Sequence, residues 1–254
     1  MWMLNDTCTV GVIVWTALAA ATPSRAAEAK LAMPNGDSAR GKPLYRRYCV
    51  GCHGPKGDGQ GENAPWLDPR PRDFTAGTFK CRSTPTGSLP LDSDLFATIG
   101  RGLYASGMPS WGALMPQERA DLLAYIKSFS PRFHEEKLEP ALQIPSEPPD
   151  NAESVARGDQ VYQRMECFKC HGKDGSGNGQ SSNTLTDNKE RPIVPYDFTT
   201  GTRFKCGQTN EDLYRIFMTG LDGTPMPSFH DQLQPAEAWD LVHYLRTLQV
   251  RVKK

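Results

Sequence analysis

The feature that most constrains this chain is an internal repeat. The string Cys49-Val-Gly-Cys52-His53-Gly54 recurs as Cys167-Phe-Lys-Cys170-His171-Gly172, at a separation of 118 residues (49 to 167). Three further blocks recur in the same order: Asp73-Phe74-Thr75 as Asp197-Phe198-Thr199, Phe79-Lys80-Cys81 as Phe204-Lys205-Cys206, and Met108-Pro109-Ser110 as Met226-Pro227-Ser228. Self-similarity of this kind predicts two homologous modules of about 100 residues each.

A proline-rich segment separates the two modules. Residues 131–151 contain Pro131, Pro140, Pro145, Pro148 and Pro149, with several charges. This composition predicts an extended and fairly stiff linker. We therefore expect a first domain at 30–130, a linker at 131–151 and a second domain at 152–254.

Residues 1–29 have the pattern of an export signal. The apolar run at 10–21 is too short to span a bilayer, and small residues suited to cleavage after Ala26 or Ala29 follow it. The start of the leader departs from the usual pattern, because residues 1–6 contain no Lys or Arg. We expect an exported, periplasmic protein, with membrane anchoring as the alternative if the leader is not cleaved.

Charge and composition narrow the class of protein further. The formal net charge is +0, so no basic field is present to recruit nucleic acid. Hydrophobic residues make up only 38% of the chain, which also contains 23 glycines and 21 prolines. This hydrophobic content is low for a core made of side chains alone, so we expect another apolar group to fill part of the interior.

The hydrophobic pattern predicts an all-α fold with long loops and no extended strand. Each module has three expected helices, which begin near Ala39, Asp94 and Pro116 in the first and near Val155, Asp212 and Pro235 in the second. The first helix is expected to reach the Cys-x-x-Cys-His string, at Cys167 in the second module. The two aspartates are expected to serve as N-caps, because a short acidic side chain can accept hydrogen bonds from the first backbone amides.

Cys-x-x-Cys-His is the attachment signal for haem c. Residues three and four apart share one helix face, so the two cysteines can form thioethers to a macrocycle whose iron binds the imidazole. The pattern predicts two covalently bound haem c groups, held by Cys49, Cys52 and His53 and by Cys167, Cys170 and His171. The alternatives are a zinc site that includes Cys81 and a disulfide within each string. Zinc is less favoured, because zinc motifs usually offer two separated ligand pairs.

Met108 and Met226 are the candidates for the second axial ligand of each iron. Each lies 55 residues after the histidine of its string (53 to 108 and 171 to 226) and is followed by Pro-Ser and an aromatic residue. The alternative is that these methionines fill gaps in the core. His/Met ligation raises the reduction potential and leaves the iron without an open position, which favours electron exchange over substrate binding.

Cys81 and Cys206 occupy equivalent positions in the two modules. They could form a disulfide between the modules, since the expected compartment permits one, or serve as ligands. We favour buried thiols over both of these arrangements. The basic residues beside them, Lys80, Arg82, Arg203 and Lys205, could neutralise haem propionates or form a solvated basic face.

On these haem strings and the repeated Met-Pro-Ser, the chain resembles the class I c-type cytochromes, and in its duplication the tandem diheme cytochromes c. The resemblance implies two small helical domains, each wrapped around one covalently bound haem with one edge exposed. It implies that His53 and Met108 ligate the first iron, and His171 and Met226 the second.

The expected function follows from this resemblance. We expect an electron-transfer protein rather than an enzyme, acting in a respiratory chain as a carrier or as the cytochrome subunit of an oxidoreductase. The expected partners are a redox protein donor and acceptor, with a membrane respiratory complex as one candidate, and no nucleic acid. The alternatives are a diheme enzyme of the peroxidase or thiosulfate-oxidising type and a sensory haem module.

Overall fold

The computed structural model describes residues 33–201 and 203–250, so the expected export signal at 1–29 lies outside the described residues. The first module contains α1 (Ser38–Tyr48), α2 (Val50–His53), α3 (Asp92–Arg101) and α4 (Pro116–Lys127), followed by the short α5 (Arg132–Glu135). The second contains α6 (Ala152–Arg164), α7 (Phe168–His171), α8 (Asn210–Thr219) and α9 (Pro235–Val250). The described part contains only two isolated β-bridges and no strand, which confirms the all-α prediction.

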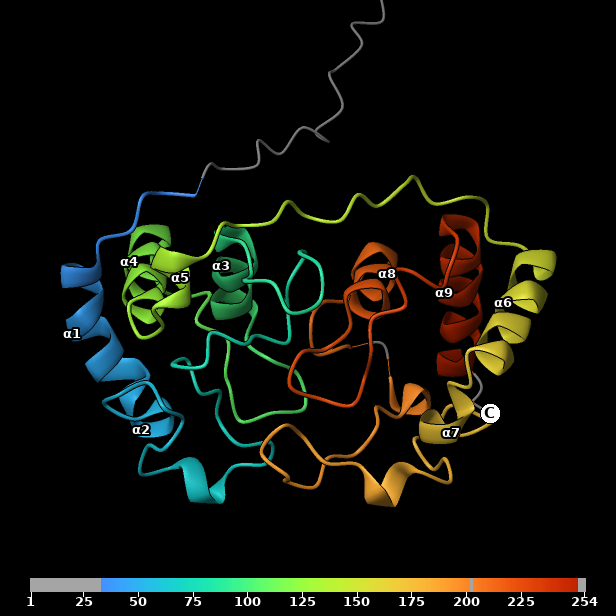
Figure 1. Ribbon diagram of the computed structural model, residues 1–254, viewed down its shortest axis with the longest axis horizontal. Helices are drawn as coiled ribbons and strands as arrows, with labels where there is room; N and C mark the ends of the chain where they lie inside the picture. Colours follow the sequence, from blue (N-terminus) through green and yellow to red (C-terminus); the bar gives the residue numbers. More distant parts are fainter. Residues whose placement is uncertain (1–32, 202, 251–254) are drawn as a thin grey trace, which may run out of the picture. The chain divides into compact units, whose positions relative to one another are not determined.

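In each module the first helix crosses the last one at very short range. Figure 1 shows α1 beside α4 and α6 beside α9. A glycine allows each crossing. A Cβ atom on Gly41 would lie 1.9 Å from the carbonyl oxygen of Asp121, and one on Gly158 would lie 2.0 Å from that of Asp240. Because any side chain would push the helices apart, these glycines set the depth of the packing.

A tyrosine on the first helix fixes the start of the loop that follows each haem string. The hydroxyl of Tyr45 donates a hydrogen bond to the carbonyl of Gly54 at 2.8 Å, and that of Tyr162 donates to Gly172 at 2.6 Å. Both tyrosines are fully buried, so their hydroxyls need these partners. The first helix thus holds the attachment turn in place in both modules.

The predicted N-caps at Asp94 and Asp212 are wrong by a few residues. Helix α3 begins at Asp92 and α8 at Asn210, so both aspartates lie inside the first turn. The Asp94 carboxylate accepts hydrogen bonds from the backbone amides of Leu91 and Ser83, and Asp212 accepts from Thr209. An acid three positions into a helix can reach back to the capping residue, and both aspartates do so here.

The first helix of the second module is shorter than predicted. Helix α6 ends at Arg164 instead of continuing to Cys167, because Glu166 has a left-handed backbone (φ 56°) that interrupts the helix. The chain then starts a separate turn, α7, at Phe168. A non-glycine residue with positive φ is uncommon, and no simple sequence pattern predicts it.

Each module has its own buried core, and both cores have aromatic residues at their centre. The first core contains Tyr45, Phe74 and Phe79, and the second Tyr162, Phe198 and Phe204.

The linker begins with one helical turn, α5, which the sequence did not predict. Its remaining residues, 136–151, have no regular structure. Leu142 and Ile144 of the linker pack against the second core. The proposed domain boundaries remain predictions.

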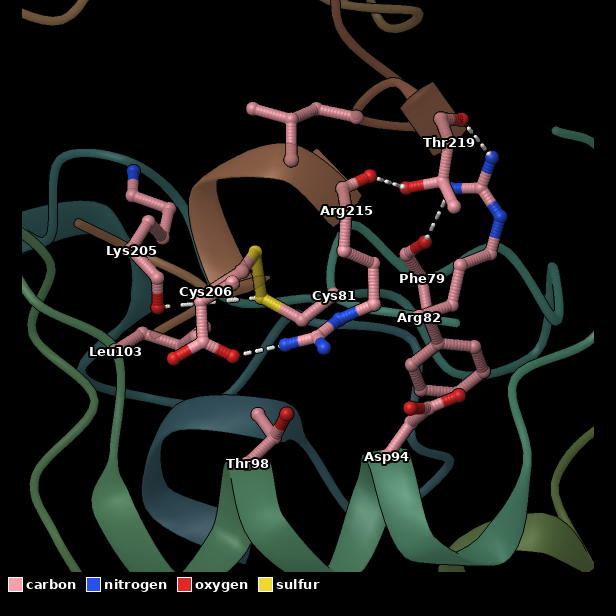
Figure 2. The surroundings of a disulfide bond; sticks show 12 residues. Phe79, Cys81, Arg82, Asp94, Thr98, Leu103, Lys205, Cys206, Arg215 and Thr219 are labelled. Atoms are coloured by element: carbon pink, nitrogen blue, oxygen red, sulfur yellow. Dashed lines mark hydrogen bonds and ion pairs between the residues drawn. A yellow bond between two sulfur atoms is a disulfide. The ribbon is translucent and has the colours of Figure 1, made fainter. Parts of the chain in front are cut away.

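The two modules are joined by a disulfide between Cys81 and Cys206 (Figure 2). Their Cα atoms lie 5.2 Å apart. The expectation of buried thiols at these positions was therefore wrong. Two equivalent positions of the modules thus come together, as residues on the axis of an isologous interface do.

A buried arginine forms a second connection between the modules. The side chain of Arg82 is fully buried and donates to the carbonyl oxygen of Thr219 at 2.6 Å (Figure 2). It also forms an ion pair with Asp222 at 2.8 Å, and Asp222 in turn accepts from Thr86 at 2.9 Å. The interface is thus polar as well as covalent.

We expect acid to weaken the helix crossings. Hydrogen bonds from Arg40 hold the pKa of Asp121 below its ordinary value. Burial alone would raise the pKa of Asp240, but hydrogen bonds from Arg157 and Ser154 outweigh it and lower this pKa as well. A lowered folded-state pKa gives stability that is present above the ordinary carboxyl pKa and is lost as pH falls through the folded value.

The melting temperature of the protein should therefore fall on acidification, and Asp240→Asn should make it less dependent on pH in the acidic range. The exposed Asp159→Asn on α6 is the matched control and should leave the pH dependence unchanged. Equal acid sensitivity in Asp240→Asn and the unmodified protein would contradict this assignment. Thermal unfolding followed by circular dichroism over a pH series makes the measurement.

Candidate haem-attachment sites

Each Cys-x-x-Cys-His string forms one helical turn. In the first module the amide of His53 donates to the carbonyl of Cys49 at 2.9 Å, and in the second His171 donates to Cys167 at 2.9 Å. These i to i+4 bonds place the two cysteines and the histidine of each string on one turn, as the spacing predicts. The four cysteines of the strings are free thiols, so the alternative of a disulfide within each string is not what the structure has.

The histidines are oriented with one ring nitrogen already bonded. Nδ1 of His53 lies 2.9 Å from the carbonyl oxygen of Arg72, and Nδ1 of His171 lies 2.9 Å from that of Tyr196. A carbonyl oxygen can only accept, so Nδ1 carries the proton and Nε2 keeps its lone pair. Burial lowers the pKa of both imidazoles, which keeps them neutral. Each histidine is thus prepared to ligate a metal through Nε2.

The repeated Asp-Phe-Thr segments position these histidines, a role that the sequence analysis did not assign. Phe74 stacks on the ring of His53, with centroids 4.3 Å apart, and Phe198 packs on His171 at 5.0 Å. The amide of Phe74 donates to Gly57 at 2.7 Å, which fixes it to the glycine loop after the string. Recurrence of Asp-Phe-Thr in both modules was the available signal, but only the folded chain shows what the phenylalanine contacts.

The two candidate methionines lie in loops of the same conformation. The carbonyl of Met108 accepts from the amide of Leu103 at 3.1 Å, and that of Met226 accepts from Leu221 at 3.1 Å. Each loop leaves its helix through a glycine with positive φ, Gly102 at 71° and its counterpart at 70°. Both methionines are half-buried. The backbone around the two methionines therefore matches, and their role as ligands stays a prediction.

Burial acts on the thiols of the attachment turns. It raises the pKa of Cys49 and of Cys167 to about 12, with a smaller contribution from the second cysteine of each string. Burial thus favours the protonated thiol over the thiolate at both positions. The disulfide between Cys81 and Cys206 leaves Cys81 without a free thiol, so it is no longer a candidate zinc ligand. In the part of the chain that the structure describes, no three His, Cys, Asp or Glu side chains are grouped to hold a metal ion.

The residues at each site fit a covalently held macrocycle. Free thiols can form two thioethers, Nε2 of the histidine can bind iron, and the surroundings are apolar. Cys49 and Val50 pack against the first core, and Cys167, Phe168 and Met226 against the second. The fold and these sites define a class, a helical protein with tandem haem-attachment modules.

Comparison with known proteins gives the same class. Residues 155–249 match the cytochrome c family, and residues 36–126 match the family of subunit III of cbb3-type cytochrome c oxidase. A solved chain of the reducing HAO-like protein complex of Kuenenia stuttgartiensis is 40% identical and superimposes with a TM-score of 0.82. The match covers 85% of this chain and 98% of that one. No curated protein matches.

The chain therefore belongs to the c-type cytochromes, as a tandem member with two cytochrome c domains. Cytochrome c domains bind haem c and transfer electrons, so this chain is an electron-transfer cytochrome.

Proposed function

We propose that the chain is an exported, periplasmic diheme cytochrome that passes single electrons between redox proteins of a respiratory chain. It acts either as a carrier or as the cytochrome subunit of an oxidoreductase. Haem c supplies, when bound, a one-electron Fe(III)/Fe(II) couple. The observation that carries the proposal is the duplicated helical turn, which holds two free thiols and an imidazole whose Nε2 is free.

Two further observations support the finer parts of the proposal. The solved relative is part of a protein complex, which supports a protein partner for this chain. Among the described residues no helix is long and apolar enough to cross a membrane. The leader pattern at 1–29 supports export.

The proposal is tested on protein purified from a host able to mature c-type cytochromes. We expect a mass increased by two haem groups, absorption bands of low-spin haem and reversible reduction of both centres by one electron each. Resting protein that binds cyanide or reacts with peroxide would favour the diheme enzyme instead. Colourless protein of unmodified mass would contradict the proposal.

Met108→Ala is expected to open the first site to external ligands while both haems stay attached, since the cysteines are unchanged. About half of the absorption band that arises from iron–methionine ligation should disappear, and cyanide should bind to the variant. Met115→Ala is the matched control, because Met115 is 66% exposed and has no counterpart in the second module. An unchanged spectrum in Met108→Ala would show that this methionine is not the ligand.

A further inference from the structure

Three half-buried cations lie where the two modules meet: Arg72, Lys80 and Lys205. The lysines directly precede Cys81 and Cys206, so the disulfide brings one from each module into the same region, and Figure 2 shows Lys205 beside it. Arg72 lies close enough to lower the pKa of both lysines through its charge. In the part of the chain described, none of the three side chains forms an ion pair.

Three carboxylates around this cluster already have partners. They form ion pairs with other basic residues: Asp73 with Lys189 at 2.8 Å, Asp187 with Arg191 at 2.6 Å and Asp222 with Arg82 at 2.8 Å. Asp68 attracts Lys205 but is exposed and forms no ion pair among the described residues. The protein's own acids therefore leave the three cations without a direct counter-charge.

The other two basic residues that flank the cysteines do not belong to this cluster. Arg82 is committed to protein acceptors in the interface, and the exposed Arg203 stacks on the ring of Tyr104 at 5.2 Å. Of the four basic residues that flank the disulfide cysteines, only Lys80 and Lys205 thus remain as candidates to bind an anion.

Burial makes the cluster costly unless an anion joins it. It lowers the pKa of Lys80 to about 8, and the charges of Lys205 and Arg72 lower it as well. Burial also lowers the pKa of Lys205. Protein groups alone thus disfavour the charged forms, whereas a carboxylate in contact would favour them.

The cluster is connected to both attachment sites through their aromatic stacks. Phe79, which precedes Lys80, stacks on Phe74 at 6.1 Å, and Phe74 stacks on His53. Phe204, which precedes Lys205, packs edge-on against Phe198 at 6.2 Å, and the ring of Phe198 is tilted against that of His171. The backbone of Arg72 contacts His53 directly. The anionic groups that a haem would bring to these sites are its two propionates.

We propose that Arg72, Lys80 and Lys205 form one shared cluster that neutralises haem propionates and couples the two redox centres, so that a lysine of one module acts on the haem of the other. The proposal rests on the proposed function, because it requires both haems. A nearby positive charge favours the reduced iron, since reduction lowers the positive charge of the centre. The cluster therefore raises both potentials.

The test removes one positive charge at a time. In Lys80→Gln and in Lys205→Gln we expect both midpoint potentials to fall, each by up to about the 59 mV that corresponds to a tenfold weaker one-electron reduction. Lys80→Arg and Lys205→Arg keep the charge and should keep both potentials. Lys42→Gln and Lys137→Gln remove exposed charges elsewhere and serve as matched controls. Spectroelectrochemical titration of the purified holoprotein measures the midpoint potentials of both haems.

Each outcome has one meaning. If a Gln variant shifts only one potential, the lysines act within their own modules and the coupling is refuted. If both potentials are unchanged but a co-purifying redox partner binds less tightly, the cluster is a docking site for an acidic protein and the proposal is wrong. Either Gln variant suffices, so failure of one to mature does not remove the test. Colourless unmodified protein would instead refute the proposed function.

Discussion

Gly158→Ala is expected to lower the free energy of unfolding by roughly 3 kcal/mol or more, as overpacking of a close contact does. The added Cβ would lie 2.0 Å from the carbonyl oxygen of Asp240 and 2.7 Å from Cβ of Tyr244. Neither atom can move away by rotation of a side chain, so α6 and α9 have to separate. Alanine favours a helix over glycine by about 1 kcal/mol, which is too little to offset this clash.

The matched control for this substitution is Gln160→Ala, at an exposed position of the same helix. It should change the stability by no more than about 0.5 kcal/mol, as is usual for surface positions. Gly41→Ala should repeat the large effect in the first module, because its Cβ would lie 1.9 Å from the carbonyl oxygen of Asp121. Thermal unfolding followed by circular dichroism measures all three, and a Gly158→Ala protein as stable as the unmodified one would contradict the close crossing.

Arg82→Met is expected to destabilise the protein by about 3 kcal/mol, because it leaves buried groups without partners. The carbonyl oxygen of Thr219 would lose its donor, and the Asp222 carboxylate, whose side chain is only 13% exposed, would lose its cation. Asp222 keeps hydrogen bonds from Thr86 and the amide of Gly87, which limits the loss. The disulfide still joins the two modules in this variant. The loss of stability therefore measures the lost contacts between the modules and not their dissociation.

A double-mutant cycle with Asp222→Asn isolates the ion pair. The two substitutions together should cost less than the sum of their separate costs, because each already removes the same interaction. Arg46→Met replaces an exposed arginine whose side chain has no partner among the residues that the structure describes, and it should have almost no effect. Additive costs in the cycle, measured by urea unfolding, would show that Arg82 and Asp222 do not interact in solution.

Most of what defines the class of protein could be predicted from the sequence. The haem strings, their spacing and the duplication are local patterns, and the three main helices of each module follow from hydrophobic periodicity, whereas the short turns α2, α5 and α7 do not. The starts of the last helices at Pro116 and Pro235 were correct, since proline marks a first helical turn. The predicted helix boundaries were wrong at two kinds of position. At Glu166 a single backbone angle ends the helix, and at Asp94 a side chain inside the first turn bonds back to the residue that precedes the helix.

The tertiary structure decided which distant residues meet. Pairing of Cys81 with Cys206 across 125 residues, the use of Arg82 as an interface residue and the stacking of Phe74 on His53 are contacts between segments far apart in the chain or in different loops. The sequence by itself determined that two covalent haem strings lie in two helical modules, because attachment depends on residues within one helical turn. Only folding determined how the modules face each other, because that depends on the complementarity of two whole surfaces, which no local pattern records.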